Sequence, residues 1–528
     1  MKKFFTALMT FSACCMTGNA QNTDLEGIQF QFKKHAPTTQ HASGKRFEQV
    51  YDNSSYFPHV GNPKALVILA EFQDVRFSVD DPKGTFEKYL NGSYLTQAAD
   101  GSVGRNYGSV AQYFDDCSFG LFRPQFDLVG PVLLSEKLST YGKGSNDRID
   151  LLLPEVCKLV DDEVDFSEYD SNNDGAVDLV YVIYAGYSES ISGNSSDCIW
   201  PKSGITSGGT YDGKRVSRYG VNGELNGTPE TTKQYGFLVN GIGLFCHEFS
   251  HCLGLPDLYG YETSDASKYD QMNNQGMEYW DLMDAGCYLN NGYTPIPYTA
   301  WEREAMGWLE IDTLDTPANI TLATVQDGAK AYRLLNDNDA TGHEYFMLEN
   351  IQKKGWASYA NGHGLLVTHV DFAPYTFEVG GRPNGTNGHP RMTVVAADGL
   401  LLSSYLVDAT YKGKVITQSD IRIDEQGDPF PGTSGNTELT DESVVKFPIY
   451  TGTAMDKPIT EIAETADGVV TFKFMGGMQT AVNSLSLDAE GHGTTAVCYT
   501  LDGRRVGNDW SQLPKGIYII GKQKVVVR

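Results

Sequence analysis

The segment His247-Glu248-Phe249-Ser250-His251 constrains this chain more than any other feature of its sequence. Two histidines four residues apart share one face of an α-helix, so both imidazoles can reach a single metal ion. Glu248 follows the first histidine directly and would lie beside the metal, where a carboxylate can take a proton from water. The segment therefore predicts a zinc-binding helix with Glu248 as its general base.

The residues after this helix predict how the metal shell is completed. Gly254 can adopt the backbone angles of a sharp turn, which would bring Asp257 back as the third zinc ligand and leave a fourth position for water. Glu278 or Asp281 could compete for the third position. The alternative interpretation is a surface helix with two unrelated histidines, and the apolar or small residues 241–245 argue against it.

Several segments resemble the immune-inhibitor-A metallopeptidases, a metzincin-like group secreted by bacteria. The resemblance runs over residues 63–475 and includes HEFSHCLGLPDLYG, WDLMDAG, ALVILAEFQDV, SVAQYFDDCSFGLF and GLLVTHVD. It implies a zinc endopeptidase with a methionine turn beneath the metal, and Met283 fits that turn. Ordinary core packing is the alternative for Met283. No tyrosine lies two residues past Met283, so the extra tyrosine that some metzincins use cannot be assigned.

The resemblance and the motif together predict hydrolysis of extracellular proteins or peptides. The rival interpretation is a catalytically silent binding or adhesion protein on a metalloprotease scaffold. The intact Glu248 argues against it, because a silent relative has no need of the base.

A second segment has the spacing of a calcium loop. Oxygen-bearing side chains recur at alternate positions and again further on: Asp170, Asn172, Asp174 and Asp178. Gly175 occupies the sixth position, as in an EF-hand-like loop, but position twelve is Tyr181 instead of glutamate. We therefore expect Ca²⁺ here, with the Asn/Asp-rich turn before a strand as the alternative.

The charge balance limits the partners. A net charge of −26 repels phosphate backbones, so no nucleic-acid partner is expected. Nine cysteines, of which Cys14 and Cys15 lie near the N-terminus, leave seven widely spaced ones. This odd number argues against a disulfide-stapled scaffold, although one or two bridges stay open.

The N-terminus has the pattern of a secretion signal. Lys2 and Lys3 precede a short apolar stretch, and small residues before Gln21 offer a cleavage site, so residues 1–20 are the expected signal peptide. Lipoprotein processing at Cys14 is the alternative. The apolar run is too short for a transmembrane anchor, and no other segment predicts one. The expected location is outside a bacterial cell or on its surface.

The texture of the chain predicts an α+β fold. We expect a metzincin-like catalytic domain, with a mixed sheet and an active-site helix, followed by antiparallel β domains. The divisions are a pro-segment or arm at 21–60, the catalytic domain at 61–310, a sandwich-like β domain at 311–477 and a small β unit at 478–528. Buried strands are expected near 65–72 and 179–185, helices over 147–161 with a kink at Pro154 and over 236–252, and three short strands in the last unit.

Two remaining features concern the later half. The stretch LPKGIY near the end resembles the sorting domains of type IX secretion cargo, which implies attachment to the outer surface through residues 478–528. His363, His369 and His389 could form a second metal site with Asp371, but scattered strand histidines favour a structural role.

Overall fold

The computed structural model describes residues 56–92, 106–142, 146–190, 197–236, 238–260, 276–386, 388–408, 410–411, 413–477, 498–500, 505–507, 513–520 and 523–527. The expected signal peptide and most of the expected arm lie outside these residues. None of the helices in the described ranges has the length and apolar run that crossing a bilayer requires.

The first half of the chain builds a five-stranded mixed sheet in the order β2-β1-β3-β5-β4. Four strands are parallel and β4, at one edge, runs antiparallel to β5. The strands are β1 Lys64–Glu71, β2 Gln125–Leu133, β3 Val180–Tyr187, β4 Lys202–Tyr211 and β5 Lys214–Leu225. β1 and β3 confirm the two buried strands expected from the sequence.

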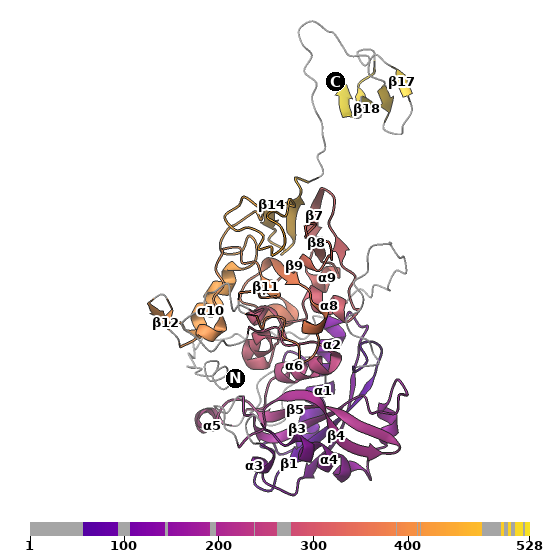
Figure 1. The fold of residues 1–528 in the computed structure, drawn as a ribbon, viewed down its shortest axis with the longest axis vertical. Helices are drawn as coiled ribbons and strands as arrows, with labels where there is room; N and C mark the ends of the chain where they lie inside the picture. Colours follow the sequence, from indigo (N-terminus) through magenta and orange to yellow (C-terminus); the bar gives the residue numbers. More distant parts are fainter. Residues whose placement is uncertain are drawn as a thin grey trace.

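Helices cover both faces of this sheet (Figure 1). Alternate residues of β1 face opposite cores, since Ala65 and Val67 belong to one hydrophobic cluster whereas Leu66 and Ile68 belong to another. The first cluster, here called the central core, includes α1 Pro82–Asn91, α2 Val110–Cys117 and α6 Ile242–Leu253. The second includes α3 Leu138–Tyr141 and α4 Ile149–Val160. The mixed α/β architecture agrees with the expected fold class.

The helix expected over 147–161 is α4, which spans Ile149–Val160 without a break at Pro154. Five of its residues besides Ile149 are buried in the second cluster. The start of the other expected helix needs correction. α6 begins at Ile242 and not near 236, because Val239 bridges to Leu225 and Gly241 has an extended backbone. Val239, Asn240 and Gly241 are buried beside the sheet. A short separate helix, α5 Pro229–Tyr235, lies before them.

Further short helical segments lie within this region and after it. Within it, η1 Phe166–Tyr169 precedes β3. After α6 the described chain continues with η3 Glu278–Trp280, η4 Ala285–Gly292 and α8 Ala300–Ala305.

The later half contains two further sheets that face each other. One has the order β11-β10-β9-β8-β6 and the other β14-β15-β7. Their strands are β6 Asp312–Thr313, β7 Ala318–Leu322, β8 Tyr332–Leu335, β9 Glu344–Ile351, β10 Gly364–Asp371, β11 Met392–Val394, β14 Ile459–Glu464 and β15 Val470–Phe474. A third hydrophobic cluster, which includes Phe346, Leu365 and Phe472, lies between them. Such packing of two sheets is sandwich-like.

The smaller elements of this half are α9 Val325–Gly328, η5 Gly355–Tyr359, η6 Pro374–Thr376, η7 Ser404–Leu406, β12 Thr410–Tyr411, β13 Lys414–Val415, α10 Gln418–Asp424 and η8 Glu425–Gly427. Near the C-terminus, β16 Cys498–Thr500, β17 Arg505–Gly507, β18 Gly516–Ile520 and β19 Gln523–Val527 form one antiparallel sheet. The sequence indicated three strands here, and the structure has four.

The central core joins the two halves. β9 contributes Tyr345 and Met347 to it, on the face opposite to Phe346 and Leu348. Trp301 of α8 donates a hydrogen bond to the Tyr345 hydroxyl at 3.0 Å, and the Trp280 indole donates to Asp428 Oδ2 at 2.7 Å. The two halves therefore share one hydrophobic core, to which α6 also belongs.

Candidate metal centre

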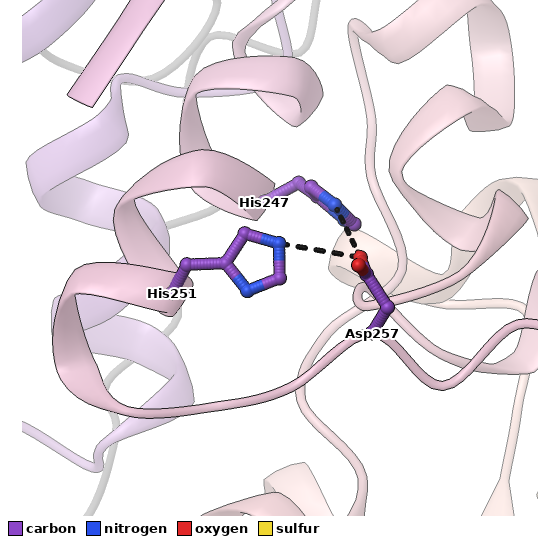
Figure 2. A group of neighbouring side chains, drawn as sticks. All are labelled: His247, His251 and Asp257. Carbon is purple, nitrogen blue, oxygen red and sulfur yellow. Dashed lines mark ion pairs between the residues drawn. The ribbon is translucent and has the colours of Figure 1, made fainter. Parts of the chain in front are cut away.

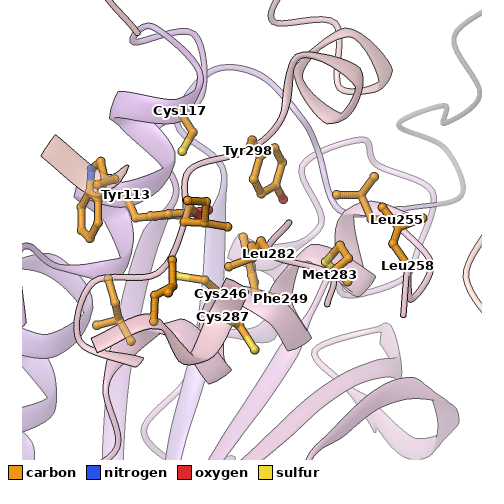
Figure 3. Packing of buried hydrophobic residues seen from close by; sticks show 14 of the residues in the cluster. Tyr113, Cys117, Cys246, Phe249, Leu255, Leu258, Leu282, Met283, Cys287 and Tyr298 are labelled. Atoms are coloured by element: carbon orange, nitrogen blue, oxygen red, sulfur yellow. The ribbon is translucent and has the colours of Figure 1, made fainter. Parts of the chain in front are cut away.

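The helix α6 is fixed on several sides by groups remote in sequence. Gly241 and Gly243 let the backbone of η4 approach, because a Cβ at Gly243 would lie 1.9 Å from the Cys287 oxygen. On another face, Phe249 packs among Phe57, Phe114 and Phe126 with ring centroids 5.1–5.3 Å apart. Figure 3 shows Cys246 and Phe249 of this helix among other buried side chains, such as Leu282 and Cys287. Contacts within the protein therefore position this helix without any contribution from a metal ion.

Gly254 ends the helix in a left-handed conformation, with φ of +115°, where a side chain would be strained. The chain then turns back, and Leu258 N donates to Met283 O at 2.9 Å. Met283 is fully buried next to Leu255 and Leu258 (Figure 3). This backbone bond joins the Asp257 loop to the methionine segment, which is how Asp257 reaches the helix.

The two histidines and Asp257 converge (Figure 2). His247 Nε2 lies 3.3 Å and His251 Nε2 3.2 Å from the same oxygen, Asp257 Oδ1. Each Nδ1 faces a carbonyl oxygen: that of Leu282 at 2.9 Å for His247, and that of Leu255 at 2.7 Å for His251. Because a carbonyl only accepts, both Nδ1 atoms carry the proton, and Nε2 of each neutral ring is left to bind a cation.

The charges of this group favour a cation. Burial lowers the pKa of His251, but the Asp257 carboxylate outweighs burial and raises that pKa to about 9. Burial would raise the pKa of Asp257, whereas the two histidines hold it far below its usual range. The three side chains therefore attract positive charge, in the form of protons or of a metal ion.

The separations also fit zinc. Zinc bonds of 2.0–2.2 Å in a tetrahedron place neighbouring ligand atoms about 3.3–3.5 Å apart. The two distances to Asp257 Oδ1 agree with this to about 0.1 Å. In the described part of the chain, no other set of three histidine, cysteine or acidic side chains comes together in this way.

The competing carboxylates have other partners. Asp281 is fully buried and accepts from Met283 N at 2.7 Å, and Glu278 accepts from Ser404 N at 3.2 Å. Burial, with a contribution from Glu302, raises the pKa of Asp281 well above its usual value. Of the three carboxylates considered from the sequence, only Asp257 joins the histidines.

Glu248 is 5% exposed and lies on the wall of a cavity of about 340 Å³ that also contains both histidines and Asp257. Burial raises the pKa of its carboxyl, and His247 and His251 oppose that shift. A partly desolvated carboxylate beside a cation site is suited to accept a proton.

In the predicted calcium loop, a lysine and backbone N–H groups contact the side-chain oxygens that were expected to bind Ca²⁺. Asp170 Oδ2 lies 2.6 Å from the ammonium of Lys214, and its two oxygens accept from the N–H groups of Asp174 and Gly175. Asp178 accepts from Ser171 N at 2.9 Å. Asn172 Oδ1 accepts from Asp174 N at 3.0 Å. A lysine from β5 thus supplies the positive charge beside Asp170.

The later histidines each have a separate acidic partner. His363 Nδ1 lies 2.9 Å from Glu464, His369 Nε2 3.0 Å from Glu344, and His389 Nε2 2.6 Å from Asp371. This favours structural roles. Cys246 and Cys252 are buried thiols, as are Cys117, Cys157 and Cys287.

Sequence reasoning missed the walls of the cleft. Trp200, Lys202 and Ser203 of the β4 region border the 340 Å³ cavity, with Tyr288 from η4 and Val379 from the later half. None of these lies in a recognisable motif, so only the fold could reveal them. Tyr288 is five residues past Met283, which is why the expected tyrosine spacing did not find it.

Comparisons with known proteins support a metallopeptidase domain in this part of the chain. Residues 53–309 match the family described as "Immune inhibitor A peptidase M6, catalytic domain". The match supports assignment of this segment to the immune inhibitor A family.

Two known proteins are similar to this chain in sequence. Immune inhibitor A of Bacillus thuringiensis subsp. alesti is 24% identical over 330 residues, which cover 52% of this chain and 45% of that protein. Pre-pro-metalloprotease PrtV of Vibrio cholerae serotype O1 is 22% identical over 279 residues, or 46% of this chain and 29% of that protein. The chain thus spans less than half the length of the curated relatives it matches.

Proposed function

We propose that the protein is a secreted zinc-dependent endopeptidase of metzincin type that hydrolyses extracellular proteins or peptides. The observation that carries the proposal is the convergence of His247 Nε2, His251 Nε2 and Asp257 Oδ1 at zinc-like separations. Gly254 and Met283 would hold this geometry through the turn and the backbone bond described above.

A zinc ion in this position would supply a Lewis acid for a peptide carbonyl and lower the pKa of a water molecule toward neutrality. Glu248 would accept a proton from the attacking water and pass it to the departing amine. Leu282 O and Leu255 O would keep each imidazole in the required tautomer, because they hold its Nδ1–H.

The strand β4 is the proposed platform for the substrate. Among the described strands it pairs only with β5, so its outer edge can bind an extended peptide by backbone hydrogen bonds. Ser203 of this strand borders two cavities, both of which His251 also lines. A peptide along β4 would therefore pass over the metal with one residue in each cavity.

Export and attachment are further parts of the proposal. The relatives named above and the signal-like N-terminus support secretion, and the four-stranded C-terminal sheet is the candidate for sorting or surface attachment. Division at residues 60, 310 and 477 remains our proposed organisation. Calcium at the Asp170–Asp178 loop also remains a proposal, and there it would have to displace the Lys214 ammonium.

The test is hydrolysis of casein by the purified full chain with and without a zinc chelator. Glu248→Ala should lower turnover by about 100-fold or more while one zinc ion stays bound, because general base catalysis contributes about 10²–10⁴-fold. Glu163→Ala, at an exposed position, is the matched control and should retain full activity. Normal hydrolysis by Glu248→Ala would refute the mechanism. A wild-type protein that does not hydrolyse casein, with or without the chelator, would favour the silent binding protein.

A further inference from the structure

The two oxygens of the Asp257 carboxylate have different surroundings. Oδ1 lies 3.3 Å from His247 Nε2 and 3.2 Å from His251 Nε2, as described above. Oδ2 accepts a hydrogen bond from the Tyr259 hydroxyl at 3.0 Å. The oxygen that Tyr259 contacts is therefore not the one that lies nearest to the histidines.

The segment Asp257-Leu258-Tyr259 explains why these two side chains meet. The Leu258 side chain is fully buried in the central core, whereas Asp257 and Tyr259 both line the 340 Å³ cavity. This alternation is that of an extended segment, in which residues two apart share a side. Tyr259 therefore lies beside Asp257 on the cavity wall.

Hydrogen bonds hold the backbone between these two residues. Leu258 N donates to Met283 O at 2.9 Å, and Leu258 O accepts from Met277 N at 3.2 Å. Leu258 O also accepts from the side-chain amide of Asn384 at 2.7 Å. Asn384 is 5% exposed and comes from the later half of the chain. The Tyr259 side chain therefore starts from a backbone that is held from both sides.

The contact with Oδ2 bears on how a carboxylate binds a metal ion, which it can do through one oxygen or through both. A zinc site with three protein ligands and water in the fourth position needs only one oxygen from its carboxylate. A hydrogen bond to the second oxygen favours this mode, because it compensates the charge on that oxygen and fixes the plane of the carboxylate. The Tyr259 phenol makes such a hydrogen bond.

We propose that Tyr259 is a positioning residue for the proposed zinc ligand Asp257. Its hydroxyl holds Oδ2, so that Oδ1 alone binds the metal and the fourth position stays open to water. This role rests on the proposed function and adds a residue to its metal centre. Without the hydroxyl, the carboxylate could turn about its Cβ–Cγ bond. Zinc would then bind more weakly, and Oδ2 could compete with water for the metal.

The test compares the wild type with Tyr259→Phe, which keeps the aromatic ring and removes only the hydroxyl. Zinc affinity, measured in competition with a chromogenic chelator, should fall about 10- to 100-fold, as it does when other partners of metal ligands are removed. In the Co²⁺-loaded protein the visible absorption should change, because it depends on the number and geometry of the ligands. Circular dichroism of the metal-free proteins would show whether the variant is folded.

Tyr169→Phe is the matched control. The Tyr169 hydroxyl donates to another carboxylate oxygen, Asp127 Oδ2, at 3.1 Å. Tyr169 packs in the second cluster, on the opposite face of the first sheet from α6. This variant loses the same kind of hydrogen bond away from the metal centre, so it should keep the zinc affinity and the cobalt spectrum of the wild type. An equal loss of affinity in both variants would overturn the assignment of Tyr259.

The other outcomes separate the role of Tyr259 from the proposed function. Unchanged zinc affinity or an unchanged cobalt spectrum in Tyr259→Phe would overturn the inference and leave the proposed function standing. If kcat for casein nevertheless fell in that variant, the hydroxyl would serve the substrate instead of Asp257. A wild type that binds no zinc would overturn the proposed function together with the inference.

Discussion

Replacing Ser250 with alanine should destabilise this protein more than replacing both Ser250 and Tyr298. The Ser250 hydroxyl donates to Cys246 O at 2.7 Å, and its oxygen lies 2.5 Å from the Tyr298 hydroxyl. Since the serine proton is used for Cys246 O, the phenol donates to Ser250 Oγ. Tyr298 is 1% exposed, so its hydroxyl has no access to water when Ser250 is removed.

The magnitude follows from these contacts. Tyr298→Phe loses one hydrogen bond, about 1 kcal/mol. Ser250→Ala loses the same bond and leaves a buried phenol donor unsatisfied, which adds about 1–3 kcal/mol. In the double variant both partners are apolar, and the total should return to about 1 kcal/mol. Adding Tyr298→Phe to Ser250→Ala should therefore stabilise the protein by about 1–3 kcal/mol, a rise in melting temperature of roughly 2–12 °C for a unit of this size.

Thermal and urea unfolding of the four proteins would measure this cycle. The zinc concentration must be the same throughout, because a bound ion shifts the unfolding midpoint. Ser139→Ala, at an exposed serine, is the control and should leave the midpoint unchanged. If the two single effects simply add in the double variant, the phenol does not depend on Ser250 and the argument is wrong.

Three further outcomes are expected. Asp257→Asn should weaken zinc binding by more than about 100-fold in competition with a chromogenic chelator, because a direct anionic ligand matters at least as much as an outer one; unchanged affinity would exclude Asp257 as a ligand. Burial raises the pKa of Asp424 to about 6, so its contribution to folding is complete below pH 4 and is lost as pH rises through 6. Unfolding midpoints of Asp424→Asn should therefore change less between pH 4 and 7 than those of the wild type, and equal slopes would contradict this. Finally, Cys117, Cys157, Cys246, Cys252 and Cys287 are buried thiols, so a thiol reagent should react with them only after denaturant is added; rapid reaction in the native protein would contradict this.

The parts of the fold that the sequence predicts are those set by local patterns. β1 and β3 were evident because uninterrupted apolar runs indicate strands covered on both faces. The C-terminal end of α6 was evident because Gly254 follows the histidine pair. Its beginning was not, since the buried Val239 bridges to Leu225 of β5, a contact that spacing does not reveal.

The same distinction applies to the site. His247, His251 and Asp257 lie within eleven residues, so helix geometry and one turn suffice to bring them together. The cleft walls come from β4, β5 and the loop around Val379, which meet only through the sheet order and the packing of the two halves. At Asp170 the sequence shows the oxygens but not Lys214, which a different strand brings to within 2.6 Å.

The continuity of the central core across residue 310 has a consequence for synthesis and export. The partners of Trp280 and Trp301, Asp428 and Tyr345, emerge from the ribosome more than forty residues after them. Until those later residues dock, the segment that carries the histidines leaves large aromatic surfaces in water, and its metal geometry is without support on one side. The proposed peptidase would therefore complete its metal site only after these later residues are synthesised. During most of its translation it would be inactive and harmless to the cell that makes it.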